Sequence, residues 1–205
     1  MNFENFTKKK TIELIEKAFQ IQKKYWKGFI EPCGIVNAKS GLCNEDCKFC
    51  AQSIRYNTHV SQYSLLSPEE ILQKAKVAQQ NGAKRFGIVT SGKKPNSKEL
   101  EKIALSIKLI KKNTSIMPCA SLGNLTKDEL KFLKENGLIR FHHNIETSRE
   151  FYSKIVTTHT FEEKIKTIYY AAEVGLEVCS GGIIGMGESE KERISFLYTL
   201  SQLPI

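Results

Sequence analysis

The chain has 205 residues, 40% hydrophobic and 26% charged, which is enough for a globular domain with its own core. Its net charge is +9, but the basic residues are dispersed and do not alternate with aromatic ones, so we expect a solvated lysine-rich surface and no nucleic-acid partner. No apolar run approaches the ~18–20 residues that span a bilayer and no secretory signal is visible, so we expect a cytoplasmic protein with no membrane partner.

The predicted elements begin with an amphipathic helix at about residues 9–28, and residues 1–29 are assigned to an N-terminal helical extension. Residues 30–205 form a second domain, in which short apolar runs alternate with helical patterns, as in a parallel sheet covered by helices. Pro118 weakens one of these runs as a strand, because proline cannot donate to a strand ladder. The predicted strands lie at 33–38, 85–90, 115–120, 138–145 and 176–184.

The helices between the strands start at recognisable capping signals. A serine or threonine followed three residues later by glutamate satisfies free backbone N–H groups of a first helical turn. Ser97 is predicted to cap one more helix without the glutamate. The complete signal occurs at Ser67, Thr126, Thr160 and Ser189.

This pattern gives about five strand–helix units and therefore an α/β fold. A closed barrel of eight units takes about 250 residues, so we expect a partial (βα) TIM-type barrel or an open sheet. In both architectures, reacting groups gather at the carboxyl ends of the strands. Cysteines, histidines and glycines follow several of the predicted strands, so we expect the functional site at that end.

Three cysteines, Cys43, Cys47 and Cys50, follow the first predicted strand. A disulfide framework is not expected in a chain without a secretory signal. A structural zinc site usually has four ligands in two Cys-x₂-Cys pairs, and only one such pair is present. A [4Fe–4S] cluster normally takes four thiolates, so three would leave one iron open to a substrate or cofactor. The spacing favours an open cluster, with zinc or inert thiols as alternatives.

The spacing Cys-x₃-Cys-x-aromatic-Cys, with Phe49 as the aromatic residue, resembles that of the radical S-adenosylmethionine (SAM) enzymes. Residues 43–56, 143–160 and 178–188 together look like the biotin synthase family. The resemblance implies a SAM-binding [4Fe–4S] cluster, cleavage of SAM to a 5′-deoxyadenosyl radical, and an auxiliary Fe–S cluster ([2Fe–2S] in the family) as sulfur donor. The implied enzyme is a sulfurtransferase that converts dethiobiotin to biotin. Its partners would include a reductant such as flavodoxin or ferredoxin, and a homodimer is allowed.

Carried over position by position, the resemblance assigns site residues but no catalytic side chain, because the chemistry belongs to the clusters. Cys43, Cys47 and Cys50 would hold the SAM cluster, and Cys119 and Cys179 would hold part of the auxiliary cluster. The residues that would contact SAM are Phe49, Asn144, Glu146, Lys164, Gly182 and Gly185, and those that would contact dethiobiotin are Asn144 and His142.

The chain departs from the family pattern at Glu146, Lys164 and His142, which replace an aspartate, an arginine and an asparagine, and more seriously at the auxiliary cluster. The family's remaining auxiliary cysteine is replaced by Gly87, which cannot bind iron. Cys33, at the start of the first strand, is either a small buried hydrophobic residue or a replacement ligand, and we favour a rebuilt site of Cys33, Cys119 and Cys179. His159 lies in a polar segment before a helix, where a surface position is expected.

The chain stops after its fifth unit, so we expect a C-terminally truncated member of the family. Whether such a chain is active alone stays open. One alternative is another radical SAM enzyme of similar fold, such as those of hydrogenase maturation or the pyrrolysine pathway. The other is a non-catalytic remnant that binds an Fe–S cluster. Cleavage of SAM without sulfur insertion would favour the first alternative, and binding without cleavage would favour the second.

Overall fold

The structure is a computed structural model that describes residues 11–205, so the first ten residues of the predicted extension lie outside the described residues. The chain divides after Pro32 into two compact units. Helix α1 (Thr11–Trp26) belongs to the first unit, with an acidic residue in its first turn and two lysines in its last, as the helix dipole favours. It ends two residues before the predicted limit.

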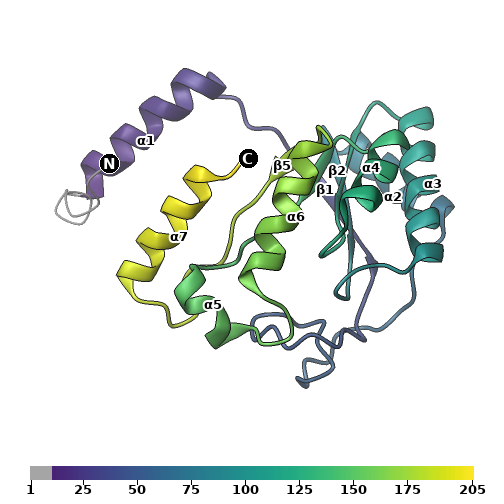
Figure 1. Ribbon diagram of the computed structural model, residues 1–205. Helices are drawn as coiled ribbons and strands as arrows, with labels where there is room; N and C mark the ends of the chain where they lie inside the picture. Colours follow the sequence, from purple (N-terminus) through teal and green to yellow (C-terminus); the bar gives the residue numbers. More distant parts are fainter. Residues whose placement is uncertain (1–10) are drawn as a thin grey trace. The chain divides into compact units, whose positions relative to one another are not determined.

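The second unit, which begins at Cys33, contains a five-stranded parallel sheet in the order β1-β2-β3-β4-β5. The strands are β1 (Cys33–Lys39), β2 (Arg85–Thr90), β3 (Met117–Ser121), β4 (Arg140–His142) and β5 (Glu177–Cys179). The helices are α2 (Pro68–Gln80), α3 (Ser97–Asn113), α4 (Lys127–Glu135), α5 (Arg149–Ile155), α6 (Phe161–Glu173) and α7 (Glu190–Gln202). Figure 1 shows this alternation of strands and helices, which confirms the predicted α/β fold of five parallel strand–helix units.

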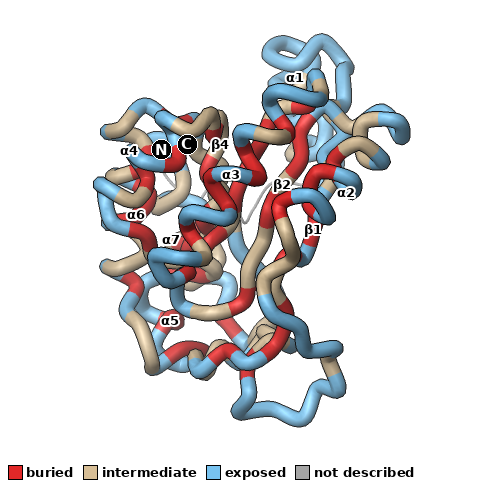
Figure 2. The backbone as a smooth tube through the Cα atoms, turned by 90° about the vertical axis from the view of Figure 1, so that its right-hand side faces the viewer, coloured by how far each residue is buried: buried red, intermediate tan, exposed pale blue. Residues whose placement is uncertain are grey.

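The two faces of the sheet differ in composition. On one face, Val36 and Ala38 of β1, Ile88 of β2 and Phe141 of β4 are buried in a core that also contains Ile103 of α3. Figure 2 shows buried stretches in these strands that alternate with intermediate or exposed ones. The alternate residues of each strand point to the opposite face, because side chains alternate along a strand. That second face carries Cys33, Cys119 and Cys179.

Pro118 lies inside β3, opposite Phe86 of β2. Its carbonyl accepts a hydrogen bond from the backbone N–H of Ile139 at 3.1 Å, and the pairing of β3 with β4 starts one residue later, at Cys119 and Arg140. The missing N–H of proline therefore falls where that ladder has not yet begun, which explains how a proline occupies a central strand. Two other predicted strands were too long, since β4 and β5 have three residues each.

The predicted capping signals at Ser67, Thr126, Thr160 and Ser189 are confirmed as capping boxes. The prediction for Ser97 was wrong: Asn96 is the N-cap, and the side chain of Glu99 completes a box with it. The short helix α5, capped by Ser148, was not predicted, because seven residues are too few to show a helical period. None of the helices in residues 11–205 combines the length and apolar character needed to cross a bilayer.

Candidate functional site

The three cysteines of the motif lie on the long loop between β1 and α2, which passes close to the end of α5 (Figure 1). The N–H of Cys43 donates to the carbonyl of Gln52 at 3.1 Å, and the N–H of Cys50 donates to the carbonyl of Cys47 at 3.0 Å. The loop is joined to α5 by a hydrogen bond of 3.0 Å from the Lys48 N–H to the Ile155 carbonyl. These backbone contacts fold the motif into a compact turn.

All three thiols line one cavity of about 550 Å³ at the carboxyl end of the sheet, as the fold predicts. Of the residues predicted to contact SAM, Phe49, Glu146 and Lys164 line the same cavity, whereas Asn144, Gly182 and Gly185 are not part of its wall. The wall also contains residues that the sequence did not single out for binding, among them Glu45, Ser91, Gly92, Lys93, Asn124 and His159.

Partial burial of Cys47 and Cys50 makes the charged form of these two thiols unfavourable. It raises the pKa of Cys47 to about 12, with a further contribution from Cys50, while Lys164 acts in the opposite direction. Burial also raises the pKa of Cys50, against a backbone hydrogen bond from Gln52. Thiolates at these positions therefore need a cation in the cavity to balance them.

Glu146 and Lys164 supply opposite charges to the wall of this cavity. Burial raises the pKa of Glu146, and Lys164 and the Asn144 amide oppose that shift. Burial lowers the pKa of Lys164, opposed by Glu146 and Cys47. Glu146 has a left-handed backbone with φ of 69°, which is uncommon for a residue with a side chain. The backbone at Glu146 is therefore held in place by its surroundings.

Gly182 explains how this strained backbone is held. Glu146 and Gly182 form an isolated parallel bridge, in which the N–H of Ile183 donates to the Glu146 carbonyl at 2.8 Å. A Cβ atom at Gly182 would lie 2.2 Å from that carbonyl oxygen and 2.7 Å from the ring of Phe196. Gly182 is thus required by close packing against the residue that lines the cavity.

Gly185 has a different role in the same glycine-rich segment. Its φ is 100°, and its N–H donates to Glu188 Oε1 at 2.7 Å. The other carboxylate oxygen of Glu188 accepts from the Met186 N–H at 2.7 Å, and Arg193 Nε donates to Oε1 at 2.7 Å. The Gly185 N–H, followed by Arg193, lowers the pKa of Glu188 to about 2. The charged carboxylate of Glu188 therefore fixes the turn at residues 185–188 by accepting hydrogen bonds from two backbone N–H groups of that turn.

A second cavity, of about 240 Å³, lies on the same face of the sheet. Its wall contains Cys33, Cys119 and Cys179, which come from three strands, together with Gly87 and His142. The two cavities share Ile35, Val89 and Ser121 and are therefore neighbours. The sequence-predicted cysteines thus separate into two groups of three, one group on each side of these shared residues.

Two arginines give the second cavity a positive wall. Arg85 and Arg140 both line it and both pair with Glu177, with N–O distances of 3.1 Å and 2.9 Å. Burial raises the pKa of Cys119 to about 11, and Arg85 and Arg140 partly offset that rise. An anionic group would be accommodated here better than in an apolar cavity.

The adjacent histidines have separate environments, as their alternation along the chain predicts. His142 faces the second cavity, and its Nδ1 lies 3.3 Å from Ser121 Oγ. Burial lowers the pKa of His142, assisted by the charge of Lys164, so the imidazole is neutral near pH 7. His143 is only 2% exposed and stacks on Phe141.

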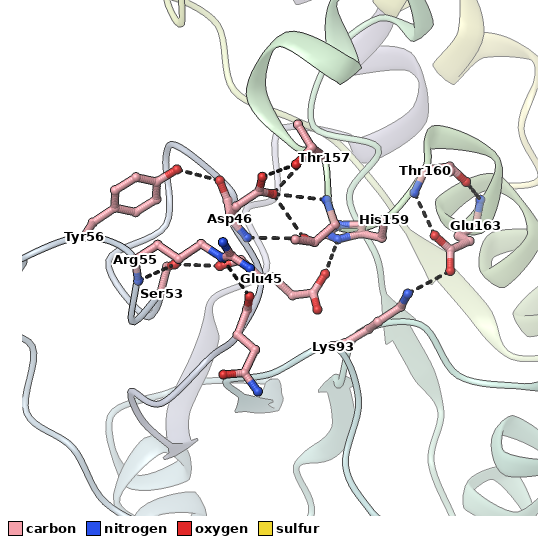
Figure 3. Close-up of polar contacts among 12 residues, drawn as sticks. Glu45, Asp46, Ser53, Arg55, Tyr56, Lys93, Thr157, His159, Thr160 and Glu163 are labelled. Carbon is pink, nitrogen blue, oxygen red and sulfur yellow. Dashed lines mark hydrogen bonds and ion pairs between the residues drawn. The ribbon is translucent and has the colours of Figure 1, made fainter.

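A polar network beside the first cavity was not predicted from the sequence. His159 was expected at the surface, but its side chain is only 8% exposed and its Nδ1 lies 2.6 Å from Glu45 Oε2. Figure 3 shows Glu45 and Asp46 of the cysteine loop reaching the segment with Thr157 and His159. These residues lie more than a hundred positions apart, so no local pattern relates them.

Comparison with known proteins decides the family. The Radical SAM superfamily pattern matches residues 39–198. Among curated proteins, the biotin synthase of Thermotoga neapolitana is 56% identical over 176 residues, which cover 86% of this chain and 63% of the relative. The biotin synthase of Thermotoga petrophila is 51% identical over 205 residues, covering 100% and 68%.

The chain belongs to the radical SAM superfamily, and within it to the biotin synthase family. It spans about 60–68% of the length of three of the curated relatives named biotin synthase that it matches. The solved structure of methylornithine synthase has the same fold, with a TM-score of 0.80 at 20% identity over 92% of this chain and 55% of that one. The FeFe-hydrogenase maturase HydG from Carboxydothermus hydrogenoformans has a TM-score of 0.74 at 22% identity, covering 85% and 41%.

A radical SAM protein needs SAM and a [4Fe–4S] cluster, and the first cavity fits them. Three cysteines line it, the raised pKa values of Cys47 and Cys50 mean that their thiolates need a positive partner, and its charged wall offers groups for a zwitterionic cofactor. Within residues 11–205, no three Cys, His, Asp or Glu side chains converge on a point where one ion could contact them all. A cubane does not require such convergence, because each thiolate binds a different iron atom.

Proposed function

We propose that this chain carries the two cluster sites of a radical SAM sulfurtransferase that converts dethiobiotin to biotin. The observation that carries the proposal is the pair of neighbouring cavities, each lined by three cysteines and separated only by shared wall residues. Identity of about half to the biotin synthase relatives over most of the chain supports the same reaction. When bound, the cluster and SAM supply the radical that removes hydrogen atoms from unactivated carbons.

In the first cavity, Cys43, Cys47 and Cys50 would hold the open cluster. The ammonium of Lys164 would bind the carboxylate of SAM as a point charge, without the two-pronged geometry of an arginine. Glu146 would accept hydrogen bonds from the ribose hydroxyls. Phe49 would cover the cluster and exclude water from it. Gly182 and Gly185 would act from outside the wall, by holding the backbone of Glu146 and the segment that follows it.

In the second cavity, Cys33, Cys119 and Cys179 would hold the auxiliary cluster that donates sulfur. Cys33 would then replace the ligand that is lost at Gly87, since both line this cavity. Arg85 and Arg140 would balance the negative charge of a thiolate-bound cluster.

Dethiobiotin would lie between the two clusters. The neutral imidazole of His142 and the amide of Asn144 can donate and accept hydrogen bonds, as recognition of a ureido group requires. The family resemblance also supports a flavodoxin or ferredoxin as the reductant, a cytoplasmic location and a homodimer as the assembly.

The test measures iron and acid-labile sulfide per chain after strictly anaerobic reconstitution. About 8 irons would indicate two four-iron clusters and about 4 would indicate one. Cys47→Ala should remove the open cluster and the formation of 5′-deoxyadenosine, and Cys33→Ala should lower the iron content while leaving 5′-deoxyadenosine formation intact. Incubation with dethiobiotin, SAM and a reductant should then yield biotin. Zinc in place of iron in the wild-type chain would contradict the proposal.

A further inference from the structure

The loop that carries the three motif cysteines is fixed on both sides by polar contacts. On one side, three successive carbonyls, of Asn44, Glu45 and Asp46, accept hydrogen bonds from side chains further along the same loop. The donors are Arg55 Nε at 3.1 Å, Ser53 Oγ at 2.5 Å and Tyr56 Oη at 2.6 Å. These contacts hold the backbone of the loop but do not join it to the rest of the domain.

On the other side, the carboxylate of Asp46 joins the loop to the connection between α5 and α6 (Figure 3). Its Oδ1 accepts from the N–H of Thr157 at 2.9 Å, from the N–H of Thr158 at 3.2 Å and from Thr158 Oγ1 at 3.1 Å. Its Oδ2 accepts from the hydroxyl of Thr157, and its own N–H donates to Thr158 Oγ1 at 3.2 Å. One side chain therefore uses both oxygens to bind two consecutive residues.

The same connection starts the helix that presents Lys164 to the first cavity. Thr160 caps α6 and Glu163 completes the box, and Glu163 also pairs with Lys93 at 3.0 Å. Lys164 is the next residue, and it lines the cavity with the cysteines. The contact between His159 and Glu45 adds a second link between the loop and this connection. Asp46 thus sits where the cysteine loop meets the start of α6.

We propose that Asp46 is a positioning residue, which holds the cysteine loop in its cluster-binding shape against the start of α6 before iron is bound. The proposal rests on the proposed function of the first cavity. It explains how the three thiols are held at a fixed position relative to Lys164. Three thiols on a free loop would have to be ordered when the cluster binds, and an anchor that is already formed removes that entropic cost. Asp46 itself binds neither iron nor SAM.

The experiment compares the wild-type chain with Asp46→Ala and Asp46→Asn after anaerobic reconstitution, by following the rate of iron loss to a chelator. Asp46→Ala removes every side-chain contact and should lose iron at least about tenfold faster, as expected for loss of hydrogen bonds to a charged group. Asp46→Asn should recover most of the retention, because its carbonyl can still accept from both N–H groups and its amide can donate to Thr157. Equal rates for the wild type and Asp46→Ala would overturn the proposal.

Ser67→Ala is the matched control, since it removes the cap of α2 at the far end of the same loop and lowers stability without removing any contact of residues 43–50. If Ser67→Ala accelerated iron loss as much as Asp46→Ala, the effect would be general destabilisation and the proposal would fail. Amide hydrogen exchange of residues 43–50, measured by mass spectrometry on the full chain without iron, tests the anchor independently of the cluster. Asp46→Ala should raise this exchange, and unchanged exchange would also overturn the proposal. A wild-type chain that takes up no iron would contradict the proposed function, while the exchange measurement would still decide the role of Asp46.

Discussion

Gly87 on β2 lies directly opposite Cys119 on β3, at the same level of the parallel sheet. A Cβ atom at Gly87 would meet nothing closer than Ile35 Cγ2, at 3.7 Å, which is an ordinary contact. A side chain at this position would therefore fit into the second cavity. β2 therefore lacks a thiol in this cavity because residue 87 is glycine, and there is room for a larger side chain there.

This relationship predicts that a ligand can be moved from one strand to another. Cys33→Ser should lower the iron content of the reconstituted protein, and Gly87→Cys in the same chain should restore it, because the thiol then enters the same cavity. Gly87→Ala in the Cys33→Ser background is the control that adds a Cβ atom without sulfur. Equal iron content in the Cys and Ala versions would contradict the prediction.

Gly182→Ala is expected to destabilise the protein. The added methyl group would lie 2.2 Å from the Glu146 carbonyl oxygen, so the backbone on one side of the bridge has to move. Overpacking of this kind typically costs about 1–3 kcal/mol, which urea unfolding would measure. At Gly181 the nearest atom to an added Cβ is Asn144 Oδ1 at 3.6 Å, so Gly181→Ala should be tolerated. A similar loss in both variants would argue against the close approach at Gly182.

Tyr152→Phe should stabilise the protein in its metal-free form. The Tyr152 hydroxyl is buried and has no hydrogen-bond partner among the described residues, and an unsatisfied buried hydroxyl is costly. Its removal should raise the free energy of unfolding by about 1 kcal/mol in urea denaturation. Tyr63→Phe is the comparison, since its hydroxyl donates to the Asn37 carbonyl at 2.7 Å and its loss should not stabilise. Equal destabilisation by the two changes would mean that the Tyr152 hydroxyl is bonded.

The lowered pKa of Glu188 predicts how the stability of the folded protein changes with pH. Its pKa falls from 4.5 to about 2 on folding, so its contribution to stability is complete above pH 4.5 and is lost as the pH falls through about 2. Glu188→Gln should therefore flatten the dependence of the urea midpoint on pH within this window and lower the midpoint at neutral pH. Glu190→Gln, in the first turn of α7, is the matched control. An unchanged slope for Glu188→Gln would show that the carboxylate is not held as described.

The fold was predictable where its signals are local. Ser67, Thr126, Thr160 and Ser189 act on N–H groups within the same turn, so their capping role is legible from the sequence. Strand length was harder to predict, because the apolar runs continue beyond the last paired residue: after β4 as far as the buried Ile145, and after β5 as far as the exposed Ile183 and Ile184.

The two groups of cysteines that line the cavities could be proposed from the sequence, whereas the contacts that hold the cysteine loop in place could not. The spacing of Cys43, Cys47 and Cys50 is a short-range pattern, and the grouping of Cys119 and Cys179 with Cys33 was inferred from the family resemblance. The anchoring of Asp46 on Thr157 joins residues 111 positions apart, and each lies in an ordinary polar segment. Burial of His159 beside Glu45 likewise depends on tertiary packing, which a single sequence does not display.

The spatial order of the strands in the sheet is the order in which they are made. Each strand leaving the ribosome therefore finds its only earlier neighbour already synthesised, and no later strand has to be inserted between two that have paired. Pairing of adjacent units keeps loop-closure costs low and lets the sheet grow during translation. At the edge of the sheet where strands are added, the unpaired strand is always the newest one. A neighbouring nascent chain could mispair with that edge until the next strand covers it.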